Sequence, residues 1–187
     1  KKLKKKYSKG TELRGKTLGI IGFGRIGQFT SRYALGCGMN VIAYDPFIEN
    51  ISVSIEIADH QLEIPIQMVN MDDLLMKSDF ISLHVPMPSD GKPVIGNEEF
   101  DLMKNGVKIV NAARGGVIDE DALLNALSSG KVAVAALDVF TGEPNPRADL
   151  LNHERIALTP HIGAATNEAQ DRIGTELASK IISRFKD

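Results

Sequence analysis

A strand, a glycine-rich turn and a helix in succession form the feature that most restricts how this chain can fold. The segment TLGIIGFGRIG, residues 17–27, is an apolar run that leads into Gly22, Gly24 and Gly27. In such a triplet the first glycine permits a tight turn, the second lets backbone approach a pyrophosphate, and the third lets helix pack on strand. The segment therefore predicts a dinucleotide site at the N-terminus of a helix, where the helix dipole favours phosphate.

Short apolar segments alternate with helix-like stretches along the rest of the chain. Most are rich in β-branched residues and apolar on both faces, as in parallel strands that are covered on both sides. We expect seven strands, at residues 17–21, 40–44, 66–69, 79–85, 107–111, 132–139 and 155–158. The alternation predicts an α/β fold in one domain, a doubly wound parallel sheet of the Rossmann type.

Three helices are expected at residues 25–36, 119–129 and 167–185. The second has Asp119 as a candidate cap and Gly130 as a stop. The first and third carry apolar residues at helical spacing, which places those residues on one face of each helix. These residues are Ile26, Phe29 and Tyr33 in the first helix, and Ile173, Leu177 and Ile181 in the third.

Composition narrows the class of protein. The 187 residues suffice for one domain with a real core, and the net charge of −2 gives no general reason to expect nucleic acid or an anionic membrane as a partner. Cys37 is the single cysteine, which fits a reducing, cytoplasmic compartment. No apolar run approaches the length of a membrane-spanning helix. The lysine-rich residues 1–16 are expected to form a solvated linker or helix remnant, and residues 17–187 the folded domain.

Asp45 follows the second expected strand, where a carboxylate can accept hydrogen bonds from the adenosine ribose hydroxyls. The same charge would repel a 2′-phosphate, so NAD is favoured over NADP. The alternative interpretation is purely structural: the glycine triplet would be an ordinary glycine-rich turn, and Asp45 with Pro46 an ordinary turn-forming pair. Their occurrence together at the right spacing favours the cofactor site.

Three polar residues follow other expected strands. Arg114 lies in NAARGGVID, Glu143 in DVFTGEP and His161 in LTPHIGA. In an open parallel sheet the carboxyl ends of the strands line the ligand crevice, so we expect all three near that edge. An arginine can bind a substrate carboxylate, a histidine can donate a proton to a developing alkoxide, and a neighbouring carboxylate can orient the histidine. The pattern indicates hydride transfer to a 2-oxo acid.

The strings GKTLGIIGFGRIG, YDP, SDFISLHVP, NAARGGVIDEDAL, AALDVFTGEP and TPHIGAAT resemble the NAD-binding domain of the D-isomer-specific 2-hydroxyacid dehydrogenases. The resemblance implies that Arg114 binds substrate, that Glu143 partners the histidine and that His161 is the acid/base. It also implies a set of cofactor contacts, in which Asp138 bonds the nicotinamide carboxamide. Those cofactor residues are Gly22, Gly24, Arg25, Ile26, Gly27, Asp45, Pro46, His84, Val85, Pro86, Ala112, Ala113, Asp138, His161, Gly163 and Ala164.

Within the family, HERIALTPHIGAATNEAQ and GTELRGKTLGIIG are most similar to the D-3-phosphoglycerate dehydrogenases. The expected substrate pair is therefore 3-phosphoglycerate and phosphohydroxypyruvate. Two alternatives stay open. One is a glyoxylate or hydroxypyruvate reductase, which uses the same three residues. The other is an NAD-dependent corepressor-like scaffold, because the C-terminal-binding proteins of this family work through partners and dimerisation.

The sequence also departs from the family pattern. The family's substrate-binding domain is built mainly from residues before the glycine motif, and here only 21 residues precede Gly22. We therefore expect an excised or partial chain that binds its cofactor and is weak or inactive alone. A homodimer is expected, and no metal site.

Overall fold

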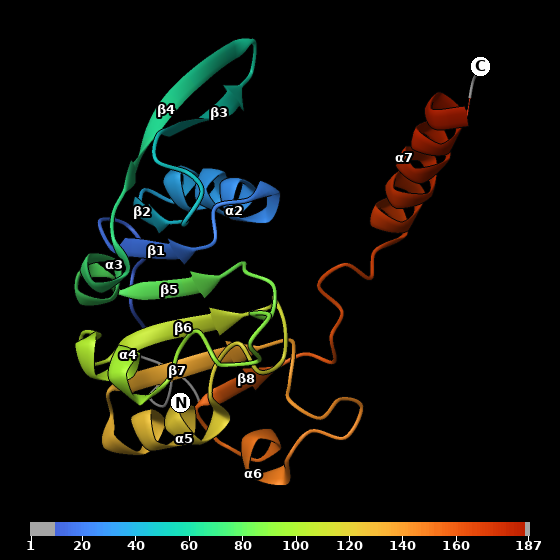
Figure 1. The fold of residues 1–187 in the computed structure, drawn as a ribbon. Coiled ribbons are helices and arrows are strands. Elements are labelled where there is room, and N and C mark those ends of the chain that lie inside the picture. Colours follow the sequence, from blue (N-terminus) through green and yellow to red (C-terminus); the bar gives the residue numbers. More distant parts are fainter. Residues whose placement is uncertain (1–9, 186–187) are drawn as a thin grey trace, which may run out of the picture.

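An eight-stranded sheet organises the protein, which we describe from a computed structural model covering residues 10–185 (Figure 1). The strands are β1 (Thr17–Ile21), β2 (Asn40–Tyr44), β3 (Ile51–Ile57), β4 (His60–Met68), β5 (Phe80–Leu83), β6 (Val107–Asn111), β7 (Val132–Leu137) and β8 (Ile156–Leu158). They lie in the order β3-β4-β2-β1-β5-β6-β7-β8, and every pair except β3–β4 is parallel. The doubly wound parallel sheet expected from the sequence is confirmed.

The helices are α2 (Arg25–Gly36), α3 (Met71–Lys77), α4 (Asn97–Leu102), α5 (Glu120–Ser129), α6 (Ala148–Leu151) and α7 (Asn167–Phe185). Helices α2 and α7 have the expected bounds. Helix α5 begins one residue later than expected, because Asp119 is its cap. The Asp119 side chain accepts a hydrogen bond from the backbone N–H of Ala122 at 3.0 Å. The short α3, α4 and α6 were not expected, since so few residues carry little periodic signal.

Strand β3 is a correction to the seven-strand expectation. It pairs antiparallel with β4, and the two form a hairpin whose turn holds Ala58 at φ 52°. Residues 51–57 alternate apolar and polar side chains, which is the pattern of a half-buried strand. The hairpin also extends β4 well before residue 66, where a strand had been expected to begin.

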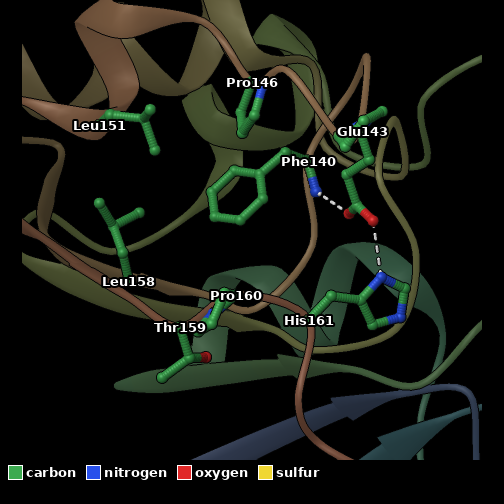
Figure 2. A pocket seen from close by; sticks show the side chains of 9 residues that line it. Phe140, Glu143, Pro146, Leu151, Leu158, Thr159, Pro160 and His161 are labelled. Carbon is green, nitrogen blue, oxygen red and sulfur yellow. Dashed lines mark hydrogen bonds and ion pairs between the residues drawn. The ribbon is translucent and has the colours of Figure 1, made fainter.

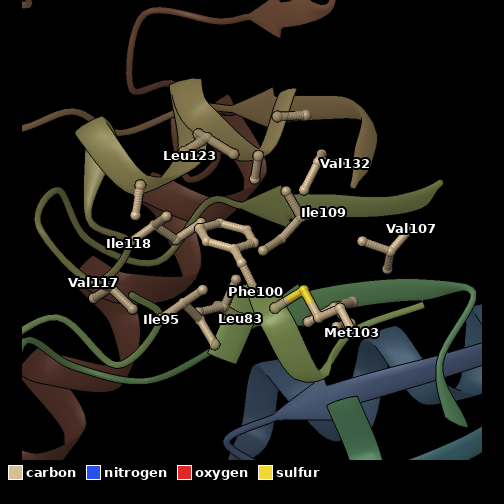
Figure 3. Close-up of a cluster of buried hydrophobic side chains, with 14 of the residues drawn as sticks. Leu83, Ile95, Phe100, Met103, Val107, Ile109, Val117, Ile118, Leu123 and Val132 are labelled. Carbon is tan, nitrogen blue, oxygen red and sulfur yellow. The ribbon is translucent and has the colours of Figure 1, made fainter. Parts of the chain in front are cut away.

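Two apolar layers form the core on opposite faces of the sheet. The larger cluster lies under α3, α4 and α5, and Figure 3 shows Phe100 of α4 and Leu123 of α5 against Ile109 and Val132 of the sheet. The smaller cluster lies beneath α2 and reaches Val53 of the hairpin. The two clusters leave the carboxyl ends of the parallel strands free to form a site.

The buried face of α2 is not the face that carries its larger apolar residues. Ile26, Phe29 and Tyr33 are 69%, 53% and 74% exposed, whereas Ser31 and Ala34 are buried. Small side chains let the helix lie close to the sheet, so the contact face of α2 is a small-residue face and its larger apolar residues point outward.

The apolar residues of helix α7 are also exposed, since Ile173, Leu177 and Ile181 are each half or more exposed. The helix projects away from the sheet at the end of an extended segment (Figure 1). An ion pair of 3.6 Å joins Glu176 of α7 to Arg25.

The predicted N-terminal segment lies partly outside the described residues, and its described part, residues 10–16, contains a turn at residues 14–15 and leads into β1. No helix within residues 10–185 combines the length and the apolar character required to cross a membrane.

Candidate active site

The glycine turn after β1 is built as tightly as its sequence suggests. Gly22 has φ 88°, and its backbone N–H donates to the carbonyl oxygen of Tyr44 at 2.9 Å. A Cβ added to Gly22 would lie 2.7 Å from the carbonyl oxygen of His84, and one added to Gly27 would lie 2.4 Å from that of Gly22. Both positions therefore require glycine, since real Cβ atoms do not approach backbone this closely.

The N-terminus of α2 fits an anionic group. Gly24 caps this helix without a side-chain hydrogen bond, and the first turn contains no acidic residue. A Cβ placed on Gly24 would meet nothing within 4 Å, so there is open space beside the free N–H groups. Such donors and the helix dipole together favour a phosphate group, which makes the backbone here and the side chain of Arg25 suitable for a pyrophosphate.

Asp45 joins the end of β2 to the glycine turn. One carboxylate oxygen accepts from the backbone N–H of Phe23 at 2.8 Å, and the other accepts from that of Phe47 at 2.9 Å. Each carboxylate oxygen can accept more than one hydrogen bond, so both remain able to bind ribose hydroxyls. Pro46 follows as an exposed residue.

A pocket of about 190 Å³ is lined by seven of the predicted site residues, which come from three segments of the chain. They are Ile26 of α2, His84, Val85 and Pro86 after β5, and Ala112, Ala113 and Arg114 after β6. The parallel strands end at the same edge of the sheet, which brings these loops together.

The His84 imidazole is partly buried at the carboxyl end of β5, where a hydrogen bond holds it. Its Nε2 lies 3.0 Å from the Ser82 hydroxyl, and burial lowers the pKa of the imidazole below its usual value. The ring is therefore neutral near pH 7, and it does not add a second positive charge beside Arg114.

The loop that carries Arg114 is held by Asn111, the last residue of β6. Asn111 is 3% exposed, accepts from the backbone N–H of Ala113 at 3.0 Å and donates to the carbonyl oxygen of Arg114 at 3.0 Å. A Cβ on Gly115 would lie 2.0 Å from the carbonyl oxygen of Phe140, so the Arg114 loop packs directly on the segment leading to Glu143. The Arg114 side chain itself is exposed.

His161 and Glu143 form a direct pair, shown in Figure 2. His161 Nδ1 lies 2.7 Å from one carboxylate oxygen of Glu143, and the other oxygen accepts from the backbone N–H of Phe140 at 2.8 Å. The hydrogen bond with His161, followed by that from Phe140, holds the pKa of Glu143 below its usual value. The pair orients the imidazole so that Nε2 faces away from Glu143.

The pair borders an apolar pocket of about 480 Å³. Phe140, Leu151, Leu158 and Pro160 supply much of its wall. Figure 2 shows these side chains to the left of the His161 imidazole, whose Nε2 points to the right.

Asp138 anchors the turn that carries His161. Its carboxylate accepts from the Thr159 hydroxyl and from the backbone N–H groups of Ile162 (2.9 Å) and Gly163 (2.8 Å). Burial opposes ionisation of Asp138, but these hydrogen bonds outweigh it and lower its pKa. His161 has φ 54°, a left-handed conformation that a non-glycine residue adopts only where its surroundings impose it.

The remaining predicted residue, Ala164, directly follows this turn, and its carbonyl oxygen accepts from the Gln170 side chain at 3.3 Å. The sequence interpretation missed three supporting residues, namely Ser82, Asn111 and Thr159. Each is a polar residue at or near the carboxyl end of an apolar strand, and that position is the signal that could have identified them.

Comparison with known proteins places this geometry in a family. Residues 1–163 match the family described as D-isomer specific 2-hydroxyacid dehydrogenase, NAD binding domain. A hydroxypyruvate reductase of Thermotoga maritima is 49% identical over 98% of this chain, which spans 58% of that protein. A D-3-phosphoglycerate dehydrogenase of Archaeoglobus fulgidus is 45% identical over 99% of this chain, which spans 34% of that protein.

Solved structures agree with the sequence relatives. A glyoxylate reductase from Paecilomyes thermophila superimposes with a TM-score of 0.76 and 40% identity, over 89% of this chain and 48% of that one. The holo form of a D-mandelate dehydrogenase from Rhodotorula graminis superimposes with a TM-score of 0.78 and 33% identity. The match covers 95% of this chain and 50% of that one. The chain thus spans about half the length of these structures, and it belongs to the NAD-binding domains of the D-isomer-specific 2-hydroxyacid dehydrogenases.

Proposed function

We propose that this chain is the part of an NAD-dependent oxidoreductase that binds the cofactor and carries the acid/base for a D-2-hydroxy acid and 2-oxo acid pair. The observation that carries the proposal is the 2.7 Å contact between His161 Nδ1 and Glu143, on loops at the same sheet edge as the glycine turn. NAD, when bound, would accept or supply the hydride.

The chain's own residues would do the rest. Arg114 binds the substrate carboxylate, since its guanidinium is a permanent planar cation. In reduction, His161 Nε2 donates a proton to the developing alkoxide oxygen, and in oxidation it takes the proton back. Glu143 stabilises the protonated ring and holds it in one orientation, while Asp138 keeps the backbone of the turn in place.

The proposed substrate pair is 3-phosphoglycerate and phosphohydroxypyruvate. Several similar relatives are named as phosphoglycerate dehydrogenases. A glyoxylate or hydroxypyruvate reductase is the second candidate, favoured by the names of two other similar proteins. We propose NAD rather than NADP because of the charge on Asp45, a cytoplasmic location because of the single free cysteine, and a homodimer as the assembly.

Paired measurements on the 187-residue chain test the proposal. NADH titration by fluorescence should show binding, because the glycine turn, Asp45 and the α2 N-terminus are all present. Turnover of phosphohydroxypyruvate, glyoxylate and pyruvate should be weak or undetectable on the same sample. The chain spans about half the length of the structures that it matches, and the positioning of a substrate can be worth roughly 7–11 kcal/mol of barrier. Absence of NADH binding would refute the cofactor assignment.

The catalytic assignment is tested in a protein that also carries a substrate-binding domain. His161→Ala should reduce turnover there by on the order of 10²–10⁴-fold, the range typical of a lost general acid. NADH affinity should stay close to that of the parent. Near-parental turnover in the variant would show that another group supplies the proton.

A further inference from the structure

Three consecutive acidic residues, Asp119, Glu120 and Asp121, stand at the start of helix α5. Acidic residues are common at such a position, because they interact favourably with the positive end of the helix dipole. Asp119 serves the helix itself, since it accepts from the backbone N–H of Ala122. The other two carboxylates contact a different segment, residues 140–147, which we call the Glu143 loop.

The Glu143 loop joins β7 to α6, and its residues 141–145 are exposed. Two hydrogen bonds within it form a turn around Glu143, one from Asn145 to the carbonyl oxygen of Gly142 at 2.9 Å and one from Phe140 to the Glu143 carboxylate at 2.8 Å. Fixing an exposed loop in one conformation costs conformational entropy. Contacts with the rest of the fold are therefore needed to keep Glu143 within reach of His161, as Figure 2 shows it.

Helix α5 supplies such a contact on each side of Glu143. Before it in the chain, Glu120 accepts from the backbone N–H of Thr141 at 2.7 Å. After it, the guanidinium of Arg147 donates to Asp121 at 2.6 Å. Because Glu120 and Asp121 are neighbours in the first turn of α5, one turn of helix fixes both ends of the loop.

The guanidinium of Arg147 is oriented independently of α5. Its Nε and Nη2 donate to the two carboxylate oxygens of Asp149 at 2.7 Å each, so the planar group is bound at two points. An isolated surface ion pair contributes little, because two long side chains must be immobilised to form it. Since Asp149 already orients the guanidinium, the contact with Asp121 costs less freedom than an isolated exposed pair would.

The start of α5 also adjoins the loop of Arg114. That loop leads directly into the helix, and Gly115 packs against the backbone of Phe140 in the Glu143 loop. The first turn of α5 is thus a shared base for the arginine proposed to bind the substrate carboxylate and for the pair proposed to move the proton.

We propose that Glu120 and Arg147 are positioning residues for the acid/base pair, and that they hold Glu143 where its carboxylate sets the tautomer of His161. The inference rests on the proposed function. With Glu143 in place, the neutral imidazole carries its proton on Nδ1, which lies 2.7 Å from the carboxylate. Nε2 then has a free electron pair, which takes the hydroxyl proton of the hydroxy acid as the hydride leaves for the cofactor. If the loop is displaced, the ring can carry its proton on Nε2 instead, and that nitrogen can no longer act as the base.

The tautomer of His161 can be measured in the 187-residue chain without any substrate. Two-bond proton–nitrogen NMR spectra of the neutral ring distinguish a proton on Nδ1 from one on Nε2. The parent should show the Nδ1–H form, and Glu120→Ala and Arg147→Ala should each shift the equilibrium toward the Nε2–H form. Glu120→Gln should keep the parental spectrum, since its amide oxygen can still accept from Thr141. A loss of charge at the helix start would instead affect both substitutions of Glu120 equally.

Turnover in a protein that also carries a substrate-binding domain provides the second measurement. Glu120→Ala and Arg147→Ala should lower kcat for hydroxy acid oxidation by about tenfold to 10²-fold, because a misplacement of about 1 Å can cost that much. The KM for the hydroxy acid should change less, since the contacts of Asn111 with the Arg114 loop are unaltered. Glu120→Gln should keep kcat close to that of the parent.

Lys77→Ala is the matched control, because it removes another exposed ion pair, the 3.0 Å contact with Asp73 on α3. It should change neither the tautomer nor kcat, and NADH binding should show that every variant is folded. Glu143→Ala is the reference for complete loss of the contact with His161.

The reference variant separates two kinds of failure. An unchanged Nδ1–H form in Glu143→Ala would refute the pairing on which the proposed function depends. A shifted tautomer in Glu143→Ala, together with parental spectra in Glu120→Ala and Arg147→Ala, would overturn the positioning role alone. Equal shifts in Glu120→Ala and Glu120→Gln would also overturn it, because the hydrogen bond from Thr141 would then not be the cause.

Discussion

At the scale of single residues, the candidate site depends on side chains that hold one another. Glu143 accepts from the Phe140 backbone with one oxygen and contacts His161 with the other, so a single carboxylate fixes both the loop and the imidazole. Asp138 holds the following turn in the same way, through three hydrogen bonds. The hydrogen bonds that these two carboxylates accept favour their ionised forms.

Replacement of Glu143 should change the pH dependence of carbonyl reduction. Glu143→Gln preserves the shape of the side chain but removes the charge that stabilises protonated His161. The alkaline limb of the pH–rate profile should therefore move to lower pH, and activity near neutrality should fall. Glu154→Gln is the control, since Glu154 makes no hydrogen bond through its side chain within the described residues. An alkaline limb at the parental pH would contradict the pairing.

Replacement of Asp45 should change the cofactor preference. Asp45→Arg removes the acceptor for the ribose hydroxyls and adds a cation that can pair with a 2′-phosphate. The ratio of NADPH to NADH affinity, measured by titration, should increase. Asp45→Ala breaks the same bonds to Phe23 and Phe47 without adding a cation, so its ratio should increase less. Equal ratios in the two variants would mean that residue 45 does not face the ribose.

At the scale of elements, helix termini and tight turns position the loops of the site. Asp119 caps α5, which begins shortly after the loop of Arg114. Glu120 in the first turn of α5 accepts from the backbone N–H of Thr141 at 2.7 Å, so α5 also supports the segment that precedes Glu143. The start of α5 therefore links two loops that are far apart in sequence.

Loss of this cap should reduce stability. Asp119→Ala removes the acceptor for the Ala122 N–H and should lower the free energy of unfolding by about 1 kcal/mol. Urea denaturation followed by circular dichroism measures the change. Asp101→Ala in α4 is the control, since Asp101 is exposed and its side chain makes no hydrogen bond within residues 10–185. Equal losses in both variants would show that the cap contributes nothing specific.

At the scale of the whole molecule, the candidate catalytic residues lie at the carboxyl ends of the parallel strands, and a structural ion pair lies at the amino ends. Asp79 accepts from the backbone N–H of Thr17 at 2.9 Å and pairs with Lys104 at 3.0 Å, which ties together the amino ends of β1, β5 and β6. Burial of Asp79 raises its pKa, but the hydrogen bond from Thr17 and the contact with Lys104 lower it by more.

This arrangement makes stability depend on pH in a defined direction. Because the pKa of Asp79 is lowered in the folded state, its contribution is present above the ordinary aspartate range and is lost as the pH falls through the folded pKa. Asp79→Asn should therefore be less stable than the parent at pH 7. The difference should shrink toward zero at an acidic pH below the lowered folded pKa of Asp79, where the parent carboxyl is protonated. Urea titrations at both pH values measure this, and an undiminished difference in acid would contradict it.

Much of the fold could be predicted because its signals are local. The glycine triplet, the apolar runs of β1, β2 and β6, and the cap and stop of α5 are each encoded within a few residues. The choice of a doubly wound sheet follows from their alternation. The candidate residues could also be named in advance, since each follows a strand and the carboxyl ends of parallel strands share one edge.

The tertiary structure alone decided which segments meet. Periodicity shows that a helix has two faces, but not which one packs, and α2 buries Ser31 and Ala34 rather than its larger apolar residues. The β3–β4 hairpin, the close approach of Gly115 to Phe140, and the donors around Asp138 likewise join residues through space. Such contacts depend on the packing of the whole chain, and no local pattern of side chains encodes them.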